Sequence, residues 1–167
     1  CHEHFVTNGK PRILPECLLG MLFYDPPVPE KDFDDLPLTA YFEDLGLVVI
    51  RSSWAQDAVH FSFKCSTPGG KTQWDNAWKL AAQTGHNHLG LSHQHPDNNS
   101  FILVANDTYL AIDDGYNRVV KAAHHNVVLV DGVGYQDEGQ NNIWANYTPD
   151  MTGVVEKYVN EDGIVYA

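Results

Sequence analysis

Two histidines separated by one residue, His93 and His95, are the side chains of this chain best spaced for shared chemistry. Residues two apart on an extended strand project from the same face, about 7 Å apart along the backbone. Neutral imidazoles are common metal ligands, and an imidazolium can neutralise an anionic substrate. The pair can therefore hold one cation together, or one histidine can bind a metal while the other faces a substrate.

Further candidate ligands adjoin apolar segments downstream. The carboxylates Asp113 and Asp114 end an apolar run, and His124 and His125 precede the run VVLV at 127–130, the most β-like of the chain. A histidine, a carboxylate and a second histidine, each at a strand end, form a three-ligand site with an open fourth position, which suits zinc. The alternative is that these are ordinary strand-end side chains, because nine histidines make one such pair unsurprising.

The order of these motifs resembles the C-terminal region of the heparinase II/III-like polysaccharide lyases, a family that includes oligoalginate lyases and heparinase II. The motifs read GHNH at 85–88, HQHPD at 93–97, SF at 100–101, IDDG at 112–115, HNVVLVDG at 125–132, and Gln136. Upstream, residues 42–54 read FEDLGLVVIRSSW and resemble the entry strand of the same family. The resemblance covers roughly residues 40–140 and rests on the order of the motifs together.

The resemblance implies a zinc ion held by His95, Asp113 and His125. Asp113 takes the family position because it directly follows the apolar run, and His125 does so because it directly precedes Asn126. Residues 114–124 alone separate Asp113 from His125, a shorter stretch than relatives usually have. We therefore expect the metal ligands to be kept and some loop contacts to substrate to be lost.

The resemblance also implies β-elimination on a uronate-containing glycan, either a glycosaminoglycan or alginate. His93 takes the position of the substrate-facing histidine, which neutralises the uronate carboxylate while a carbanion forms. Tyr116 is the candidate proton donor, with Tyr135 as the alternative. Asp97, Asn98 and Asn99 are expected to hold the loop after His95 through bonds to the backbone. The candidate substrate contacts are His88, Asn99 and Trp144.

The rest of the sequence predicts an all-β fold with one short helix. Residues 1–38, interrupted by prolines, form a connecting segment, and residues 39–167 form a β-sandwich domain of the supersandwich type. Helical spacing covers residues 74–83, and Gly85 is the expected stop. The predicted strands are 47–52, 58–64, 100–105, 109–113, 127–130, 143–147, 153–158 and 164 onward.

Charge and chain ends bear on partners. A net charge of −12, from 22 acidic and 10 basic residues, argues against nucleic acid as a partner. No apolar run reaches the length of a membrane span. The chain starts without Met and ends inside a predicted strand, so we expect a fragment of a longer protein. The resemblance implies that this protein is secreted or periplasmic, and that an N-terminal α/α-toroid domain supplies the catalytic base. The fragment alone is then expected to be inactive.

Two alternative functions stay open. A non-catalytic carbohydrate-binding or structural β-sandwich with a structural zinc would show closed four-ligand coordination, whereas three protein ligands and a water favour a lyase. A cupin-like metal enzyme also uses a His-x-His pair. Cupins, however, usually carry a glutamate a few residues later, and here residues 98–100 read NNS.

Overall fold

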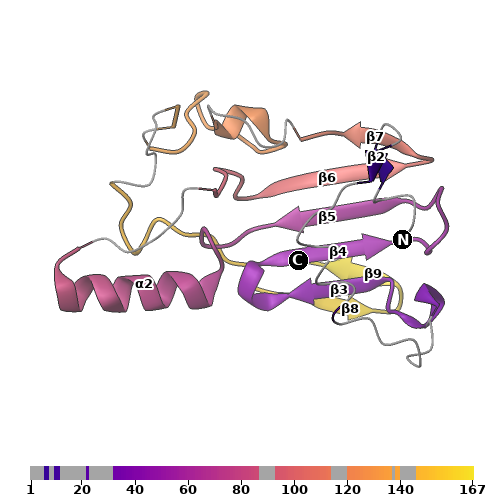
Figure 1. Ribbon diagram of the computed structural model, residues 1–167, viewed down its shortest axis with the longest axis horizontal. Helices are drawn as coiled ribbons and strands as arrows, with labels where there is room; N and C mark the ends of the chain where they lie inside the picture. Colours follow the sequence, from indigo (N-terminus) through magenta and orange to yellow (C-terminus); the bar gives the residue numbers. More distant parts are fainter. Residues whose placement is uncertain are drawn as a thin grey trace. The chain divides into compact units, whose positions relative to one another are not determined.

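The computed structural model divides into two units, Cys1–Asp35 and Leu36–Ala167 (Figure 1). In the first unit, β1 (Val6–Thr7) pairs antiparallel with β2 (Lys10–Pro11), and the 3₁₀ turn η2 (Phe33–Asp35) follows. The residues that the structure describes are 6–7, 10–11, 22, 32–86, 93–113, 120–136, 138–139 and 146–167.

A five-stranded antiparallel sheet is the framework of the second unit. Each strand pairs with its neighbour in sequence, in the order β3–β4–β5–β6–β7. The predicted strands at 47–52, 58–64, 100–105 and 109–113 are confirmed, with ends that shift by at most about two residues. The sheet and the short turn after its first strand comprise β3 (Thr39–Phe42), η3 (Glu43–Leu45), β4 (Leu47–Arg51), β5 (His60–Lys64), β6 (Ser100–Ala105) and β7 (Thr108–Ala111).

One face of this sheet is apolar. The register aligns Tyr41, Val48, Phe63 and Phe101 in a row across four strands. Side chains on one face of a sheet alternate with those on the other, so the period-2 pattern of β5 places its phenylalanines on this face. Val48 is 1% exposed, which shows that the row is covered near the middle of the sheet.

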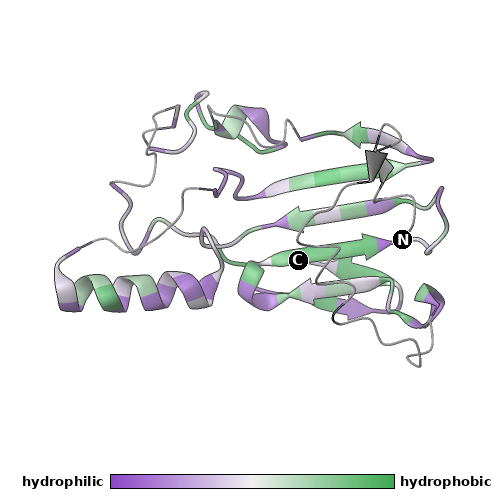
Figure 2. Cartoon of the chain, in the orientation of Figure 1, coloured by the Kyte–Doolittle hydropathy of each residue, from purple (hydrophilic) through white to green (hydrophobic). Residues whose placement is uncertain are grey.

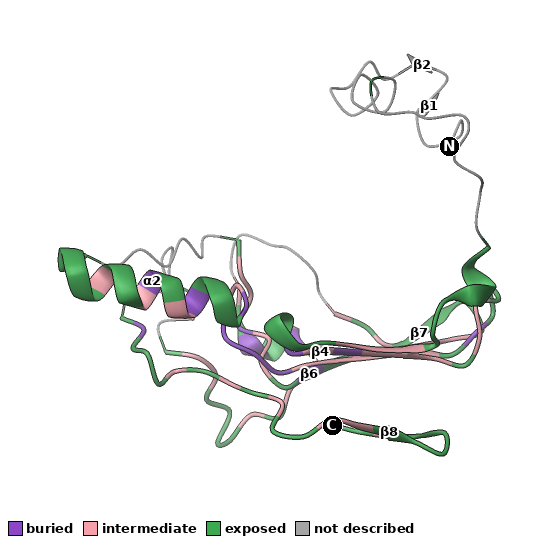
Figure 3. Ribbon diagram, turned by 90° about the horizontal axis from the view of Figure 1, so that it is seen from below, coloured by how far each residue is buried: buried purple, intermediate pink, exposed green. Residues whose placement is uncertain are grey.

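A two-stranded hairpin provides a second layer. β8 (Val159–Glu161) and β9 (Ile164–Tyr166) pair antiparallel, and Figure 3 shows them in a layer of their own beside the sheet. A cavity of about 260 Å³ is lined from one side by Val48 and Phe63 and from the other by Val165. The prediction of an all-β fold with one helix is confirmed, and within the described residues the second layer consists of this hairpin.

The helix α2 (Lys71–Thr84) confirms the prediction made for residues 74–83. It ends at Gly85, whose φ of +72° is left-handed and whose N–H bonds the carbonyl of Ala81. Hydrophobic and hydrophilic residues alternate along it, while β4 and β6 are mainly hydrophobic (Figure 2). Trp74 is 3% exposed and packs edge-on against Tyr147, so it belongs to the core. Among the described residues, no helix combines the length and the apolar character needed to cross a membrane.

Two predicted strands do not form. Residues 127–129 and 153–158 are irregular, and Val130 makes only an isolated bridge to Val133. Val128 and Val130 are 89% and 74% exposed. Their β-branched side chains favour a strand only where a neighbouring strand offers a ladder and a packing surface, and here neither is present in the described part of the chain. For the predicted strand at 143–147, residues 143–145 lie outside the described residues, and Asn146 is in a turn.

Candidate metal centre

Sheet topology brings the candidate ligands to one place. Because β6 and β7 are antiparallel neighbours, the start of β6 and the end of β7 lie at the same end of the sheet. His95 precedes β6, and Asp113 follows β7. The 3₁₀ turn η4 (Ala122–His124) lies beyond the end of β7 in Figure 1, and His125 follows it directly. Three segments that are separate in sequence therefore meet at this end.

Asn126 fixes the position of His125 against the sheet. Its backbone carbonyl accepts a bond from the Phe101 N–H at 3.3 Å. Its side-chain amide donates to the carbonyls of Phe101 at 2.9 Å and Ile112 at 3.0 Å. Asn126 is thus bonded both to Phe101, near the start of β6, and to Ile112, the residue before Asp113. The asparagine of the His-Asn motif has a structural role that its sequence position alone does not reveal.

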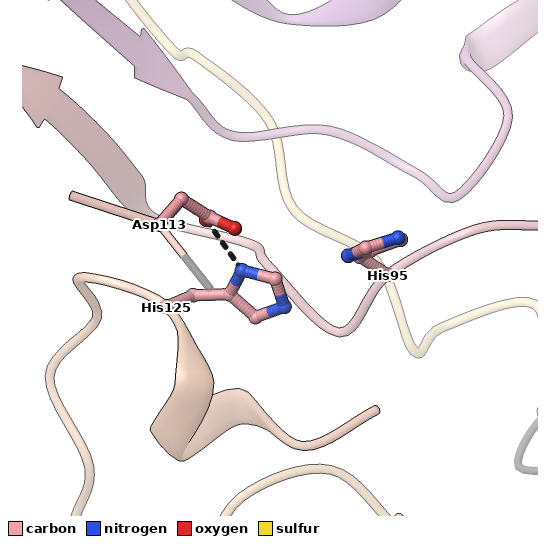
Figure 4. Close-up of side chains that lie close together, drawn as sticks. All are labelled: His95, Asp113 and His125. Atoms are coloured by element: carbon pink, nitrogen blue, oxygen red, sulfur yellow. Dashed lines mark hydrogen bonds and ion pairs between the residues drawn. The ribbon is translucent and has the colours of Figure 1, made fainter. Parts of the chain in front are cut away.

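The three predicted ligands lie together. His95, Asp113 and His125 each offer one ligand atom, and these atoms all lie within 4.8 Å of one another (Figure 4). Nδ1 of His125 is 2.5 Å from Oδ2 of Asp113, and the two imidazole centroids are 5.2 Å apart. The His125 side chain is fully buried, and that of Asp113 is 22% exposed. No other group of this kind is found in the part of the chain that the structure describes.

His125 has a nitrogen that suits a metal. Its Nε2 is buried and makes no hydrogen bond within the described residues. A buried polar atom left without a partner costs about 1–3 kcal/mol. In Figure 4, Asp113 lies on one side of the His125 ring and His95 on the other. A cation bound at Nε2 would remove the penalty. For Asp113 to bind the same ion, its carboxylate would exchange the present contact with Nδ1 for the metal.

The spacing and chemistry of the donors fit zinc. Zinc bonds to nitrogen and oxygen are about 2.0–2.2 Å long, so donor atoms around one tetrahedral zinc lie about 3.3–3.6 Å apart. The three ligand atoms here lie within 4.8 Å of one another, so small side-chain movements would complete the coordination. Two imidazoles and one carboxylate form a donor set typical of zinc with a free fourth position.

Electrostatics keep His95 in the form that binds metal. Burial lowers the pKa of the His95 imidazole, and the neighbouring His125 ring lowers that pKa further. The carboxylates of Asp97 and Asp113 act in the opposite direction but do not reverse the shift. Because metals bind neutral imidazole, a His95 that is neutral near pH 7 needs to lose no proton on binding.

The loop that carries His95 is anchored along its length. The Ser66 N–H donates to Oδ1 of Asn98 at 2.7 Å, and the Gly69 N–H donates to Oε1 of Gln94 at 3.2 Å. Pro96 is among the most deeply buried side chains. The prediction that Asn98 holds this loop through a bond to the backbone is confirmed. The same loop carries the imidazoles of His93 and His95.

An ion pair beside the loop was not predicted from the sequence. Nζ of Lys64 lies 2.8 Å from both carboxylate oxygens of Asp97, and the two side chains are 31% and 20% exposed. Asp97 therefore holds the loop through a side chain rather than through the backbone. The register pairs Lys64 with Ser100, so the pairing of β5 with β6 brings this lysine to the loop. Only the knowledge of that strand pairing could have suggested the contact.

The other predicted site residues are less closely placed. His93 is exposed at the start of the loop. Asn99 is exposed, adopts a left-handed φ of +60° and lines a cavity of about 310 Å³ that also touches Phe63 and Cys65. The remaining candidates lie outside the described residues: His88, Tyr116 and Trp144.

Comparison of the sequence with protein-family models and with curated proteins finds no match. The candidate metal centre is therefore supported by the convergence of three segments and by the unsatisfied nitrogen of His125.

We expect Asn98→Ala to destabilise the protein. The substitution removes the acceptor for the N–H of Ser66, a residue that is only 9% exposed. An unsatisfied buried donor costs about 1–3 kcal/mol, and each kcal/mol lowers the melting temperature of a domain of this size by about 2–4 °C. Thermal unfolding measures the shift. Asn160→Ala, on an exposed position of β8, is the control and should change stability by less than about 0.5 kcal/mol. Equal melting temperatures for the two variants would contradict the anchoring role of Asn98.

Proposed function

We propose that this chain is the β-sandwich part of a zinc-containing polysaccharide lyase that cleaves uronate-containing glycans by β-elimination. The observation that carries the proposal is the convergence of His95, Asp113 and His125, with the buried Nε2 of His125 left for a cation. The motif order supports the choice of lyase over other zinc proteins, because it places His93 next to that centre. The hairpin β8–β9 would then belong to the second sheet of the sandwich.

The metal has a mainly structural part in this proposal. When bound, zinc would supply a positive charge and a fixed point for three segments that no continuous ladder joins. His95 and His125 would each offer a ring nitrogen to the ion, and Asp113 would offer a carboxylate oxygen. The immediate consequence is that the loop bearing His93 is held in place next to a bound substrate.

His93 is the proposed group for charge neutralisation. In β-elimination, a base takes the proton on the carbon next to the uronate carboxylate, and the electron pair forms a double bond as the glycosidic oxygen on the neighbouring carbon leaves. The intermediate carbanion is accessible only if the carboxylate charge is neutralised. His93 is exposed and two residues from His95, so it can reach a substrate outside the buried centre. The leaving oxygen takes a proton, for which Tyr116 is the proposed donor.

The ion pair of Lys64 supports the role proposed for His93, because it makes this lysine a poor candidate for neutralising a uronate carboxylate. Lys64 lies beside the His95 loop, but its charge is already neutralised by a bidentate contact with Asp97. The chain as a whole carries a charge of −12 and repels an acidic glycan. In this proposal a local group neutralises the uronate carboxylate, and we assign that role to His93 because it is exposed and lies two residues from His95. We further propose that the base comes from an α/α-toroid domain of the full-length protein, so residues 1–167 alone are inactive.

Lyase activity is tested with the full-length protein. We expect incubation with alginate or a glycosaminoglycan to produce unsaturated uronate ends, which absorb in the near ultraviolet. The matched control is the same glycan after chemical reduction of its carboxylates to alcohols, which cannot stabilise the carbanion and should not be cleaved. Zinc binding without absorbance on any uronate glycan would favour the alternative, a carbohydrate-binding or structural β-sandwich with a structural zinc.

A further inference from the structure

A turn outside the three ligands contacts both histidine-bearing segments. Tyr135 and Glu138 close this turn, since the Glu138 N–H donates to the Tyr135 carbonyl at 3.2 Å and the Glu138 carboxylate accepts from the Tyr135 N–H at 3.2 Å. Neither residue belongs to the metal-ligand set. We call this pair of residues the Tyr135–Glu138 clamp.

The clamp reaches the His125 segment through Glu138. The carboxylate oxygen Oε2 accepts a bond from the Ala122 N–H at 2.8 Å, and Ala122 is 1% exposed. The carbonyl of the same Ala122 accepts the N–H of His125 at 3.0 Å. Glu138 therefore acts on the backbone of His125 through a single intervening residue. A carboxylate at the first N–H of a helical turn is also electrostatically favourable.

The clamp reaches the His95 segment through Tyr135. Its hydroxyl oxygen accepts a bond from the Asn98 N–H at 3.0 Å, three residues after His95. The Tyr135 ring stacks on Tyr147, which is 5% exposed and packs against Trp74. Burial raises the pKa of Tyr135 to about 12, so the phenol stays neutral and keeps its acceptor oxygen in place. The hydroxyl is thus fixed by the aromatic core rather than by the loop it holds.

Gly134 is an independent sign that the position of the Glu138 carboxylate matters. A Cβ atom at Gly134 would lie 2.7 Å from the carboxylate carbon of Glu138, too close for two carbon atoms. Glu138 cannot simply swing away, because its Oε2 holds two backbone N–H groups. Only glycine leaves room for the carboxylate where it makes both bonds.

We propose that Tyr135 and Glu138 are positioning residues that set the distance between His95 and His125 and thereby the metal affinity of the centre. This inference rests on the proposed metal centre and adds to it. Asn126 fixes His125 against the sheet, whereas the clamp bonds both to the His95 loop and to η4. Outer-shell groups of metal sites typically change affinity by about 10–100-fold when removed.

The test is a titration with Co²⁺, whose visible absorption reports both binding and coordination geometry. Tyr135→Phe keeps the stacked ring and removes the acceptor, Glu138→Ala removes the carboxylate, and Gly134→Ala displaces it. We expect each variant to bind Co²⁺ about tenfold or more weakly, with an altered visible spectrum.

Asp44→Ala is the matched control. The Asp44 carboxylate also accepts a backbone N–H at the start of a helix, that of Thr72 at 2.7 Å, and this partner belongs to α2 and not to either histidine loop. We expect Asp44→Ala to lower the melting temperature by about as much as Glu138→Ala does. Its Co²⁺ affinity should stay within about twofold of wild type. Two results would contradict the positioning role of Tyr135 and Glu138. One is a loss of Co²⁺ affinity in Asp44→Ala as large as that in Glu138→Ala, and the other is wild-type Co²⁺ affinity in Tyr135→Phe.

A second readout separates the clamp from the metal centre. In the metal-free protein, the clamp variants should shift the imidazole NMR signals of both His95 and His125, and Asp44→Ala should not. If wild type binds no Co²⁺ but these shifts occur, the proposed metal centre is contradicted, and the role of Tyr135 and Glu138 in positioning the two histidines is supported. In the opposite case, wild type binds Co²⁺ and His95→Ala does not, while the clamp variants change neither the Co²⁺ affinity nor the imidazole signals. This result would support the metal centre and contradict the positioning role of Tyr135 and Glu138.

Discussion

His95→Ala is expected to abolish stoichiometric zinc binding and to lower the melting temperature. Purified wild type should contain about one zinc per chain, because three ligand atoms lie within 4.8 Å of one another and the buried Nε2 of His125 makes no hydrogen bond among the described residues. Removal of one of three ligands leaves too few donors to hold the ion. An ion present at 100 times its Kd stabilises a protein by about 2.7 kcal/mol, which corresponds to roughly 5–10 °C for a chain of this length.

Elemental analysis and thermal unfolding measure the two effects together. Chelation of wild type should reproduce the melting temperature of His95→Ala, and chelation of the variant should change nothing further. His124→Ala is the matched control, since His124 precedes His125 directly but is not among the three converging residues. Equal zinc in wild type and His95→Ala would show that the ion binds elsewhere. Equal loss in His124→Ala would show that the choice between the two adjacent histidines is wrong.

His93→Ala is expected to fail in a different way from His95→Ala. In the full-length lyase that we propose, His93→Ala should lower kcat by ~10²-fold or more, in line with the loss of one preorganised donor to a developing anion. Zinc content and melting temperature should stay near those of wild type, because His93 is exposed and lies outside the converging group. The measurement is the rate of near-ultraviolet absorbance from unsaturated uronate ends.

The exposed His86, just after α2, provides the control for His93. His86→Ala removes a surface imidazole of the same chemistry and should leave both turnover and zinc unchanged. Wild-type turnover in His93→Ala would make His93 an ordinary loop residue and would remove the catalytic part of the proposal, even with the zinc centre intact. Loss of zinc in His93→Ala would instead assign it to the ligand set.

Local chemistry in the sequence was sufficient to predict several elements. Asn106, Asp107 and Asp162 lie at hairpin turns and adopt left-handed φ, a conformation that Asn and Asp tolerate there. Residues 100–105 form β6 as predicted, and α2 ends at Gly85 as predicted. These features depend on residues within a few positions of one another, so a single segment carries the information.

The convergence of His95, Asp113 and His125 was also predicted, but for a reason that lies outside any single segment. The three residues were chosen by motif order, and the structure brings them together because β6 and β7 pair antiparallel and Asn126 bonds to both strand ends. Residue types and spacing identify candidate ligands; only the strand pairing decides that they meet.

Tertiary structure alone decided the conformation of residues 127–130 and the contacts that hold the loops of the candidate site. Residues 127–129 remain irregular and Val130 makes only an isolated bridge to Val133, because no neighbouring strand offers this run a ladder in the described part of the chain. The ion pair of Lys64 with Asp97 and the hydrogen bond from the Ala122 N–H to Glu138 join residues at sequence separations for which no spacing rule exists. A hydrogen bond between distant residues depends on how whole elements pack, whereas turns, caps and strand periodicity depend on the backbone preferences of the residues themselves. The sequence of this protein therefore determined which groups can do chemistry, and the packing of its loops determined which groups hold them in position.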